Sequence, residues 1–440
     1  MPCIDPLLSF DLGWPAVARI VQTVGFRVAL AALVLVAHVI AVIAAARHYF
    51  DAPFNAAPGE PPSLRQPTDA SPRNWNRLAV SRWDTGNYIG IALRGYTMCP
   101  AGSLRGANLR PLLTTCNLSF YPTYPLLGWL VSGGGRLPID YALWFLALAA
   151  SGLLLFLWTG PTLVERLGLW PTYLSFIVFN LFTTGFILAT AQTEPLALVL
   201  TLGAFLALAQ RRLLLGALLA GGATAIRITA VASGLAYAAA LVAITLQERP
   251  HEWRDRLRRG AELLLSGWGI LALLGYYGVR FGDPLIYLHA HSQSFSHEAS
   301  LGQLLFPSVT LVNLSLSHPL HDGLWLAAAL LWFGLGHKQA LARFRREEKV
   351  FLYALFAACV GVAAYGSVGL AFVGMTRYLL LCLPLFFAIA ALTAHKPAVL
   401  ALWLVLSGWH YWNADLCVYT GGPGDRTLRQ CHQAFWIGRI

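Results

Sequence analysis

The sequence predicts an all-α, polytopic integral membrane protein with about eleven transmembrane helices, and three observations support this prediction. Hydrophobic residues make up 57% of the 440 residues, only 12% are charged, and the mean hydropathy is +0.60. Soluble domains are about one quarter charged, and a soluble fold this apolar would expose large adhesive patches. The apolar runs are also long and continuous, as in 143–158 and 350–370, which favours helices over the short alternating strands of a transmembrane barrel.

A helix that crosses a bilayer needs about 20 apolar residues, or fewer where the helix is broken. Arg227 interrupts one long apolar run, so the two spans beside it are the least clearly separated. The first apolar run is long enough to remain as an anchor, so no cleaved signal peptide is expected. We expect one membrane domain over residues 1–440, with spans at 25–46, 142–160, 172–191, 195–209, 213–226, 228–246, 261–279, 324–336, 350–370, 378–394 and 398–412.

Basic residues give the expected orientation. If the N-terminus is cytoplasmic, the arginine-rich segments 249–259 and 338–349 and all three lysines lie on the cytoplasmic side. The short outer loops then hold almost no basic residues, as the positive-inside rule requires. This distribution also accounts for the net charge of +11, so we expect membrane lipids and no nucleic acid as partners.

Three outer segments stand out by their length: a first loop at about 48–141, a second at 280–323 and a C-terminal tail at 413–440. Long loops in a compact protein are usually functional. Cys99 and Cys116 fall in the first loop, and Cys417 and Cys431 fall in the tail. On the oxidising side of a membrane these pairs predict two disulfides, and four free thiols are the alternative.

The stretch Ser81–Tyr96 of the first loop predicts a short amphipathic helix. Its residues Trp83, Tyr88, Ile91 and Ala92 would share one face, which we expect to rest on the membrane interface. Asp84 falls at the start of this helix. The residue is either an N-cap that accepts backbone N–H bonds or a general base that takes a proton from a sugar hydroxyl.

The order of several motifs resembles the GPI mannosyltransferase 2 family, also called PIG-V. Arg82-Trp83-Asp84 followed by Ile91-Ala92 and Gly95-Tyr96 resembles the family's W-D motif with its later I-A-x-x-G-Y. The resemblance extends from about residue 75 to residue 390. Weaker motifs continue it in the same order, at Phe120-Tyr121-Pro122-Thr123-Tyr124-Pro125-Leu126, Thr193-Glu194-Pro195-Leu196, Ala225-Ile226-Arg227 and Thr376-Arg377-Tyr378-Leu379 with Pro384.

This resemblance implies an inverting glycosyltransferase of the GT-C class, with a GT-C-like first outer loop that carries amphipathic helices. The implied donor is polyprenyl- or dolichyl-phosphate-mannose, the implied catalytic residue is Asp84, and no cofactor is implied. Thr85-Gly86-Asn87 departs from the bulkier residues that usually follow the W-D pair. The excess of arginine over lysine, with abundant Ala, Leu and Gly, indicates a high-GC bacterium, so we expect a bacterial inner membrane rather than the endoplasmic reticulum. The lipid- or glycan-linked acceptor is left open.

Isolated arginines independently indicate a phosphate-bearing substrate. Arg227, Arg280 and Arg377 fall at the outer ends of predicted spans, where arginine either binds phosphate through its rigid fork of donors or reaches out to lipid headgroups. Glu194 either binds sugar hydroxyls, holds an arginine or caps a helix beside Pro195. The residues we expect to bind substrate are Arg82, Trp83, Asn87, Glu194, Arg227, Arg377, Tyr378, His289 and His291.

The two histidines are spaced i, i+2, so on a helix they point apart, and no nearby carboxylate or cysteine completes a metal site. We therefore expect no metal. The main alternative function is a transporter or flippase of lipid-linked sugars, against which the chain shows no internal repeat. A third is a non-catalytic subunit that supports a partner enzyme.

Overall fold

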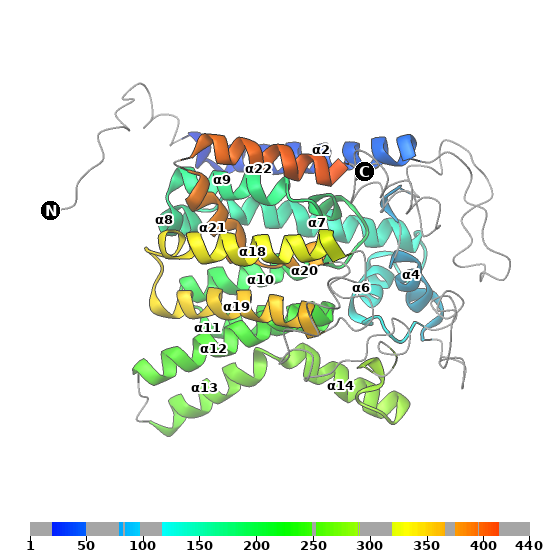
Figure 1. The fold of residues 1–440 in the computed structure, drawn as a ribbon. Coiled ribbons are helices and arrows are strands. Elements are labelled where there is room, and N and C mark those ends of the chain that lie inside the picture. Colours follow the sequence, from blue (N-terminus) through cyan, green and yellow to red (C-terminus); the bar gives the residue numbers. More distant parts are fainter. Residues whose placement is uncertain are drawn as a thin grey trace.

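The computed structural model describes residues 20–49, 79–81, 84–96, 117–248, 252–288, 290, 319–365, 375–394 and 396–412. Within these ranges the chain is helical and contains no strand (Figure 1). The elements in chain order are α2 (Val24–Tyr49), α4 (Thr85–Arg94), α6 (Thr123–Val131), α7 (Ile139–Trp158), α8 (Pro161–Leu167), α9 (Leu169–Asn180), η2 (Gly185–Ala189), α10 (Glu194–Ala209), α11 (Leu213–Ile226), η3 (Ile228–Ala230), α12 (Val231–Glu248), α13 (Trp253–Leu265), α14 (Trp268–Phe281), α18 (Pro319–Ala340), α19 (Arg346–Tyr365), α20 (Met375–Leu380), α21 (Leu383–Thr393) and α22 (Pro397–His410).

The apolar helices suit a membrane protein, but fewer of them than expected are clear spans. In the described ranges three helical stretches are long and apolar enough to cross a membrane: Val24–Arg47, Ile139–Trp158 and Ile228–Glu248. A fourth is added if α13 and α14 form one bent span. The expected number of about eleven is therefore wrong by this measure. One reason is length: α21 has 11 residues, which rise about 17 Å, whereas the hydrocarbon layer is about 30 Å thick.

The expected span 261–279 is broken. α13 ends at Leu265, α14 begins at Trp268, and the two helices are bent by 63°. Two glycines explain how the bend packs, because a Cβ on Gly221 of α11 would collide with the carbonyl oxygen of Leu265, and one on Gly269 with that of Gly221. The break frees backbone groups of the first turn of α14, and the Ile270 N–H donates to the Thr224 hydroxyl at 2.9 Å.

Replacing Gly269 by valine should lower the free energy of unfolding by about 1–3 kcal/mol, because an overpacked contact must shift backbone as well as side chains. The measurement is thermal unfolding of the full chain in detergent. Gly275→Val is the matched control on the same helix, since a Cβ there meets nothing within 4 Å. Equal unfolding midpoints for the two variants would show that the close contact of α14 with α11 at Gly269 does not stabilise the fold.

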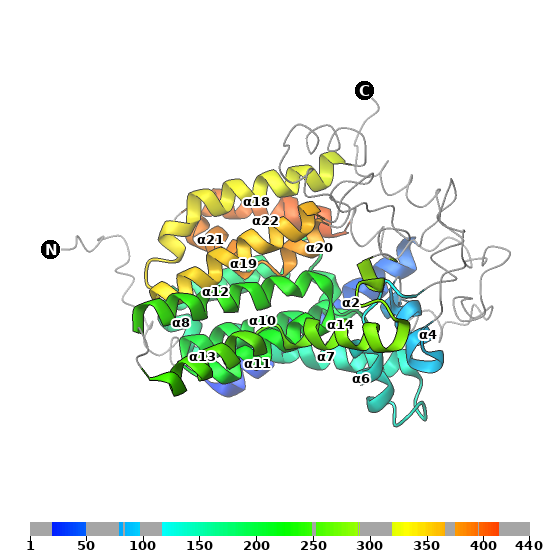
Figure 2. The ribbon, with the colours of Figure 1, turned by 90° about the horizontal axis from the view of Figure 1, so that it is seen from below.

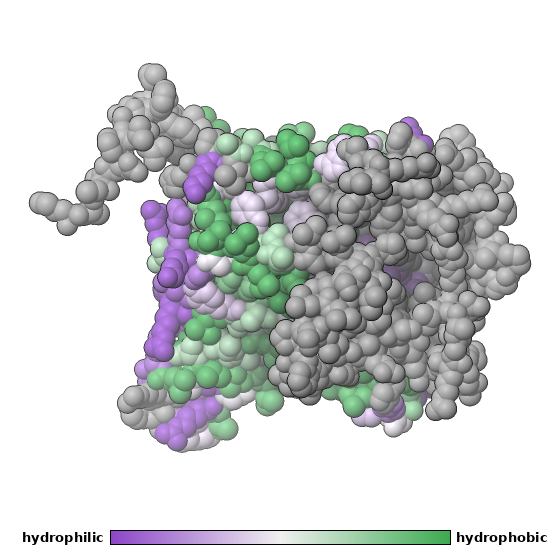
Figure 3. Space-filling model, in the orientation of Figure 1, coloured by the Kyte–Doolittle hydropathy of each residue, from purple (hydrophilic) through white to green (hydrophobic). Residues whose placement is uncertain are grey.

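Hydrophilic side chains mark one end of the bundle (Figure 3). Figure 3 shows hydrophilic side chains gathered along the edge where α8, the start of α13 and the connection between α18 and α19 lie. This end carries Arg166, Arg254 and Arg345, in keeping with the basic segments expected on the cytoplasmic side. The view from below places α4, α6 and the end of α14 together at the opposite end (Figure 2).

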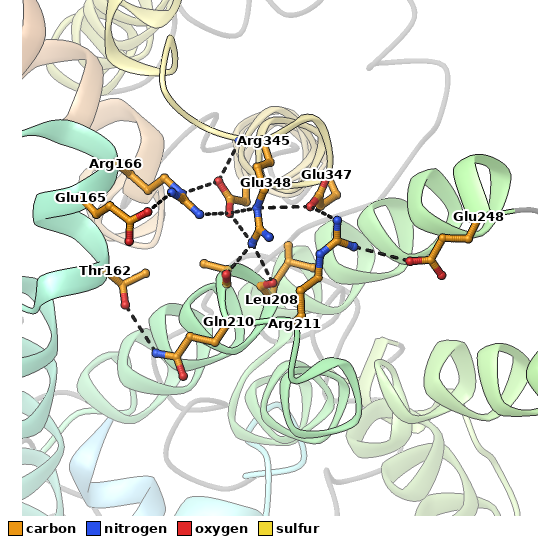
Figure 4. A network of polar contacts seen from close by, with 11 residues as sticks. Thr162, Glu165, Arg166, Leu208, Gln210, Arg211, Glu248, Arg345, Glu347 and Glu348 are labelled. Atoms are coloured by element: carbon orange, nitrogen blue, oxygen red, sulfur yellow. Dashed lines mark hydrogen bonds and ion pairs between the residues drawn. The ribbon is translucent and has the colours of Figure 1, made fainter.

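An ionic network joins helices at the basic end (Figure 4). The fully buried carboxylate of Glu348 accepts hydrogen bonds from Arg166 Nε at 2.9 Å and Arg345 Nε at 2.7 Å. Its neighbour Glu347 pairs with Arg211, in the turn between α10 and α11, at 2.8 Å. The network therefore ties α8, the turn after α10 and the start of α19 to one another.

Replacing Glu348 by glutamine should lower the free energy of unfolding by about 2–3 kcal/mol, because two guanidiniums lose a charged acceptor in a buried place. Thermal unfolding in detergent measures the change. Glu165→Gln is the control, since Glu165 contacts Arg166 in the same network but is 69% exposed. If Glu165→Gln lowers the free energy of unfolding as much as Glu348→Gln does, burial of the carboxylate does not decide the size of the effect.

Candidate functional site

Four charged side chains meet at the end of the bundle that carries α4. Arg377 of α20 lies at the centre and donates from Nε to Glu194 Oε1 at 2.7 Å and from Nη2 to Asp84 Oδ2 at 3.0 Å. Its Nη2 also lies 2.6 Å from Glu194 Oε1. Arg377 stands 293 residues after Asp84 in the sequence, so the fold alone brings them together.

Glu194, the first residue of α10, is completely buried and holds two arginines. Besides Arg377, its carboxylate contacts Nη1 of Arg227 as an ion pair. A buried carboxylate is strongly destabilising without such partners. Of the three roles considered for Glu194, the structure shows that of holding arginines. The carboxylate lies in the first turn of α10 and is closed to solvent, so it positions the two arginines of the site.

Asp84 precedes α4 but does not cap it with its side chain. The side chain is 26% exposed, and its Oδ2 atom faces Arg377. Within the described ranges no donor reaches the second carboxylate oxygen, Oδ1. Asp84 thus combines a fixed position with an open oxygen, which is the arrangement that a general base needs.

A short polar chain fixes the start of α4 and was missed from the sequence. The hydroxyl of Thr85 donates to the carbonyl of Ala191 at 3.0 Å, and Gln192 Nε2 donates to Thr85 Oγ1 at 3.2 Å. Gln192 Oε1 in turn accepts from Arg377 Nη2 at 3.4 Å. The signal available in the sequence was the polar run 190–194 between two apolar stretches.

The apolar face of α4 packs on protein. Tyr88 and Ile91 are buried in one cluster with Phe120, Tyr124 and Leu143, and Ala92 packs against it. The expectation that this face rests on the membrane interface is therefore wrong for these three residues. The helix is amphipathic because one side contacts α6 and α7. Asn87 lies half-buried on the same helix.

Tyrosines surround the charged cluster. The ring of Tyr88 lies 5.3 Å from that of Tyr124, and burial raises the pKa of the Tyr88 phenol above its ordinary value, with the charges of Asp84 and Glu194 acting in the same direction. Tyr378 is half-buried and within electrostatic reach of all four charged groups. The phenols of Tyr88 and Tyr378 therefore lie close to the four charged side chains.

Arg280 does not join this cluster: it is exposed at the end of α14, with its guanidinium 5.9 Å from the Phe281 ring. Several residues singled out in the sequence lie outside the described residues, namely Arg82, Trp83, His289 and His291, and the cysteines at 99, 116, 417 and 431. Among the residues that the structure describes, no group of three His, Cys, Asp or Glu side chains could hold a metal ion.

Fold and site together define a helical, apolar protein of the membrane type, with a buried cluster of two carboxylates and two guanidiniums at one end. No family model, curated protein or solved structure matches the chain. The assignment of a function therefore depends on the geometry of the site and on the motifs that carry its residues.

Proposed function

We propose that the protein is a membrane glycosyltransferase of the GT-C class. It transfers a mannosyl residue, with inversion, from polyprenyl-phosphate-mannose to a lipid- or glycan-linked acceptor on the non-cytoplasmic face. The observation that carries the proposal is the contact of Asp84 with Arg377, in a cluster completed by Glu194 and Arg227. All four residues belong to the motifs that resemble the GPI mannosyltransferase 2 family.

In the proposed reaction the acceptor hydroxyl gives its proton to the open oxygen of Asp84. The hydroxyl oxygen attacks C1 of the mannosyl group from the face opposite the phosphate, a bond forms between them, and the bond from C1 to the phosphate oxygen breaks. The electron pair of that bond leaves with polyprenyl phosphate. General-base assistance of this kind contributes about 10²–10⁴-fold to a rate.

The two arginines support different parts of this reaction. Arg377 holds the Asp84 carboxylate in place through its Nη2 hydrogen bond. Arg227 stabilises the negative charge that grows on the departing phosphate, as preorganised donors do in other transfer reactions. Because the donor already carries a good leaving group, the proposed step involves no cofactor or metal.

The proposal places residues 1–440 in one domain of a bacterial inner membrane, with several short or broken helices among the clear spans. The break of the chain at Arg227, between α11 and η3, supports this view. Transporters and transferases alike use interrupted helices where backbone lines a substrate path. The charged cluster lies at one end of the bundle instead of at mid-depth, which favours transfer over transport.

The test is a transfer assay with the purified full chain in proteoliposomes, using polyprenyl-phosphate-mannose with a labelled sugar and a panel of lipid and glycan acceptors. The expected result is labelled acceptor together with released polyprenyl phosphate. Movement of the intact donor across the bilayer without product would support a flippase. The absence of both from the lone chain, with activity restored by a partner protein, would support a non-catalytic subunit.

A further inference from the structure

The two arginines of the cluster differ in how their donors are used. Nε and Nη2 of Arg377 already donate to Glu194, Asp84 and Gln192. Arg227 pairs with Glu194 through Nη1, and its buried Nε has no acceptor in the part of the chain that the structure describes. Arg227 therefore keeps one donor that no described residue satisfies.

The chain just after Arg227 adds a second donor. Arg227 is extended, with φ −161° and ψ 155°, between the end of α11 and η3, which leads directly into α12. The backbone N–H groups of Ala230 and Val231 are already bonded to carbonyls of the η3 turn, so the added donor is a side chain. The hydroxyl of Thr229, 4% exposed, also has no hydrogen-bond partner in the described chain. An anion is the ligand that suits such donors.

Tyr121 brings a third donor from a distant part of the sequence. It is 4% exposed, and its hydroxyl has no partner among the residues described. Tyr121 belongs to a buried cluster with Tyr287, and Ile228, the residue between Arg227 and Thr229, packs against this cluster. Burial raises the pKa of the Tyr121 phenol, and the hydroxyl therefore stays protonated and able to donate.

A buried donor without an acceptor costs about 1–3 kcal/mol, so the unsatisfied donors of Arg227, Thr229 and Tyr121 need a reason. A phosphate group offers several oxygen acceptors, and a guanidinium matches two of them at once. Neutral hydroxyls beside the guanidinium can bind the remaining oxygens without adding charge.

We propose that Arg227, Thr229 and Tyr121 form a binding subsite for the phosphate of an isoprenoid phosphate lipid. The inference rests on the proposed function, since it assigns the donor phosphate to these residues and leaves Arg377 to hold the carboxylates. It also adds Tyr121 and Thr229, which the sequence did not single out as ligands.

The test measures affinity without catalysis, by calorimetric titration of the detergent-solubilised full chain with farnesyl phosphate, farnesol and inorganic phosphate. Tyr121→Phe and Thr229→Val should each weaken farnesyl phosphate binding about fivefold, and Arg227→Lys at least tenfold, with farnesol binding unchanged. Tyr276→Phe and Arg280→Lys are matched controls, because both residues are exposed near the same end of the protein. Thermal unfolding of each variant shows that it is folded.

Wild-type affinity for farnesyl phosphate in all three variants would overturn the subsite, as would an equal loss of farnesol binding. Equal affinity of the wild type for inorganic phosphate and farnesyl phosphate would overturn the lipid assignment. Failure of the proposed function looks different: no sugar transfer from any polyprenyl-phosphate donor, while farnesyl phosphate binding still depends on Tyr121. Unchanged KM for the donor in Tyr121→Phe, with transfer intact, would remove the subsite alone.

Discussion

Replacing Asp84 by asparagine should reduce mannosyl transfer by about 10²–10⁴-fold, the usual contribution of a general base. The amide keeps the size of the side chain and an oxygen that accepts from Arg377, so the position of α4 is preserved. It cannot take a proton from the acceptor hydroxyl. The loss should therefore appear in kcat, with KM for the lipid donor nearly unchanged, in the proteoliposome transfer assay.

The control is Asp283→Asn, the same change at a turn residue beyond α14, where Asp283 Oδ1 accepts from the Leu285 N–H at 2.8 Å. Asparagine forms the same turn, and activity should stay at the wild-type level. An Asp84→Asn protein that transfers mannose as fast as the wild type would remove Asp84 from the chemistry, whatever its contact with Arg377.

Replacing Glu194 by alanine should lower the free energy of unfolding by about 3–5 kcal/mol, because two guanidiniums lose a buried counter-charge. Transfer should also fall steeply, since Arg377 would no longer be held where it meets Asp84. Glutamine at the same position keeps one acceptor and should give a smaller loss of both. Thermal unfolding in detergent and the transfer assay measure the two effects separately.

Glu248→Ala is the matched control for stability. Glu248 also pairs with two arginines, Arg211 at 3.7 Å and Arg259 at 2.6 Å, but its side chain is 47% exposed. Exposed pairs contribute about 0–1 kcal/mol, so the control should unfold close to the wild type. If Glu194→Ala and Glu248→Ala unfold at the same temperature, the buried cluster does not stabilise the fold.

Hydropathy and charge placed most helices correctly because a bilayer selects apolar segments of a certain length wherever they fall. The expected runs 25–46, 195–209 and 213–226 coincide closely with α2, α10 and α11. The bend after Leu265 was missed, although Ser266-Gly267-Trp268-Gly269 is a typical helix-breaking sequence. Its cause is the contact with Gly221, which no local pattern records.

The sequence indicates which charged residues belong to the site, but not which of them contact one another. Asp84, Glu194, Arg227 and Arg377 were all selected, each from its own motif or from its charge in an apolar setting. Their convergence depends on how the helices pack. The direction of a side chain cannot be read from the sequence. It decides whether Glu194 faces a sugar or an arginine, and which arginine keeps an unsatisfied donor. Tyr121 was quoted only as part of the Phe120–Leu126 motif and was given no role of its own.

The cluster of two carboxylates and two guanidiniums has formal charges that cancel. These charges balance within the protein, so a small anion from water gains little long-range attraction by approaching the cluster. Selectivity must come from the rest of the ligand. At about 0.8 kcal/mol for each buried CH₂ group, a long hydrocarbon chain supplies that affinity far more readily than the phosphate does. Because its charges balance, the site would bind soluble phosphates weakly and select a phosphate that is attached to a membrane lipid.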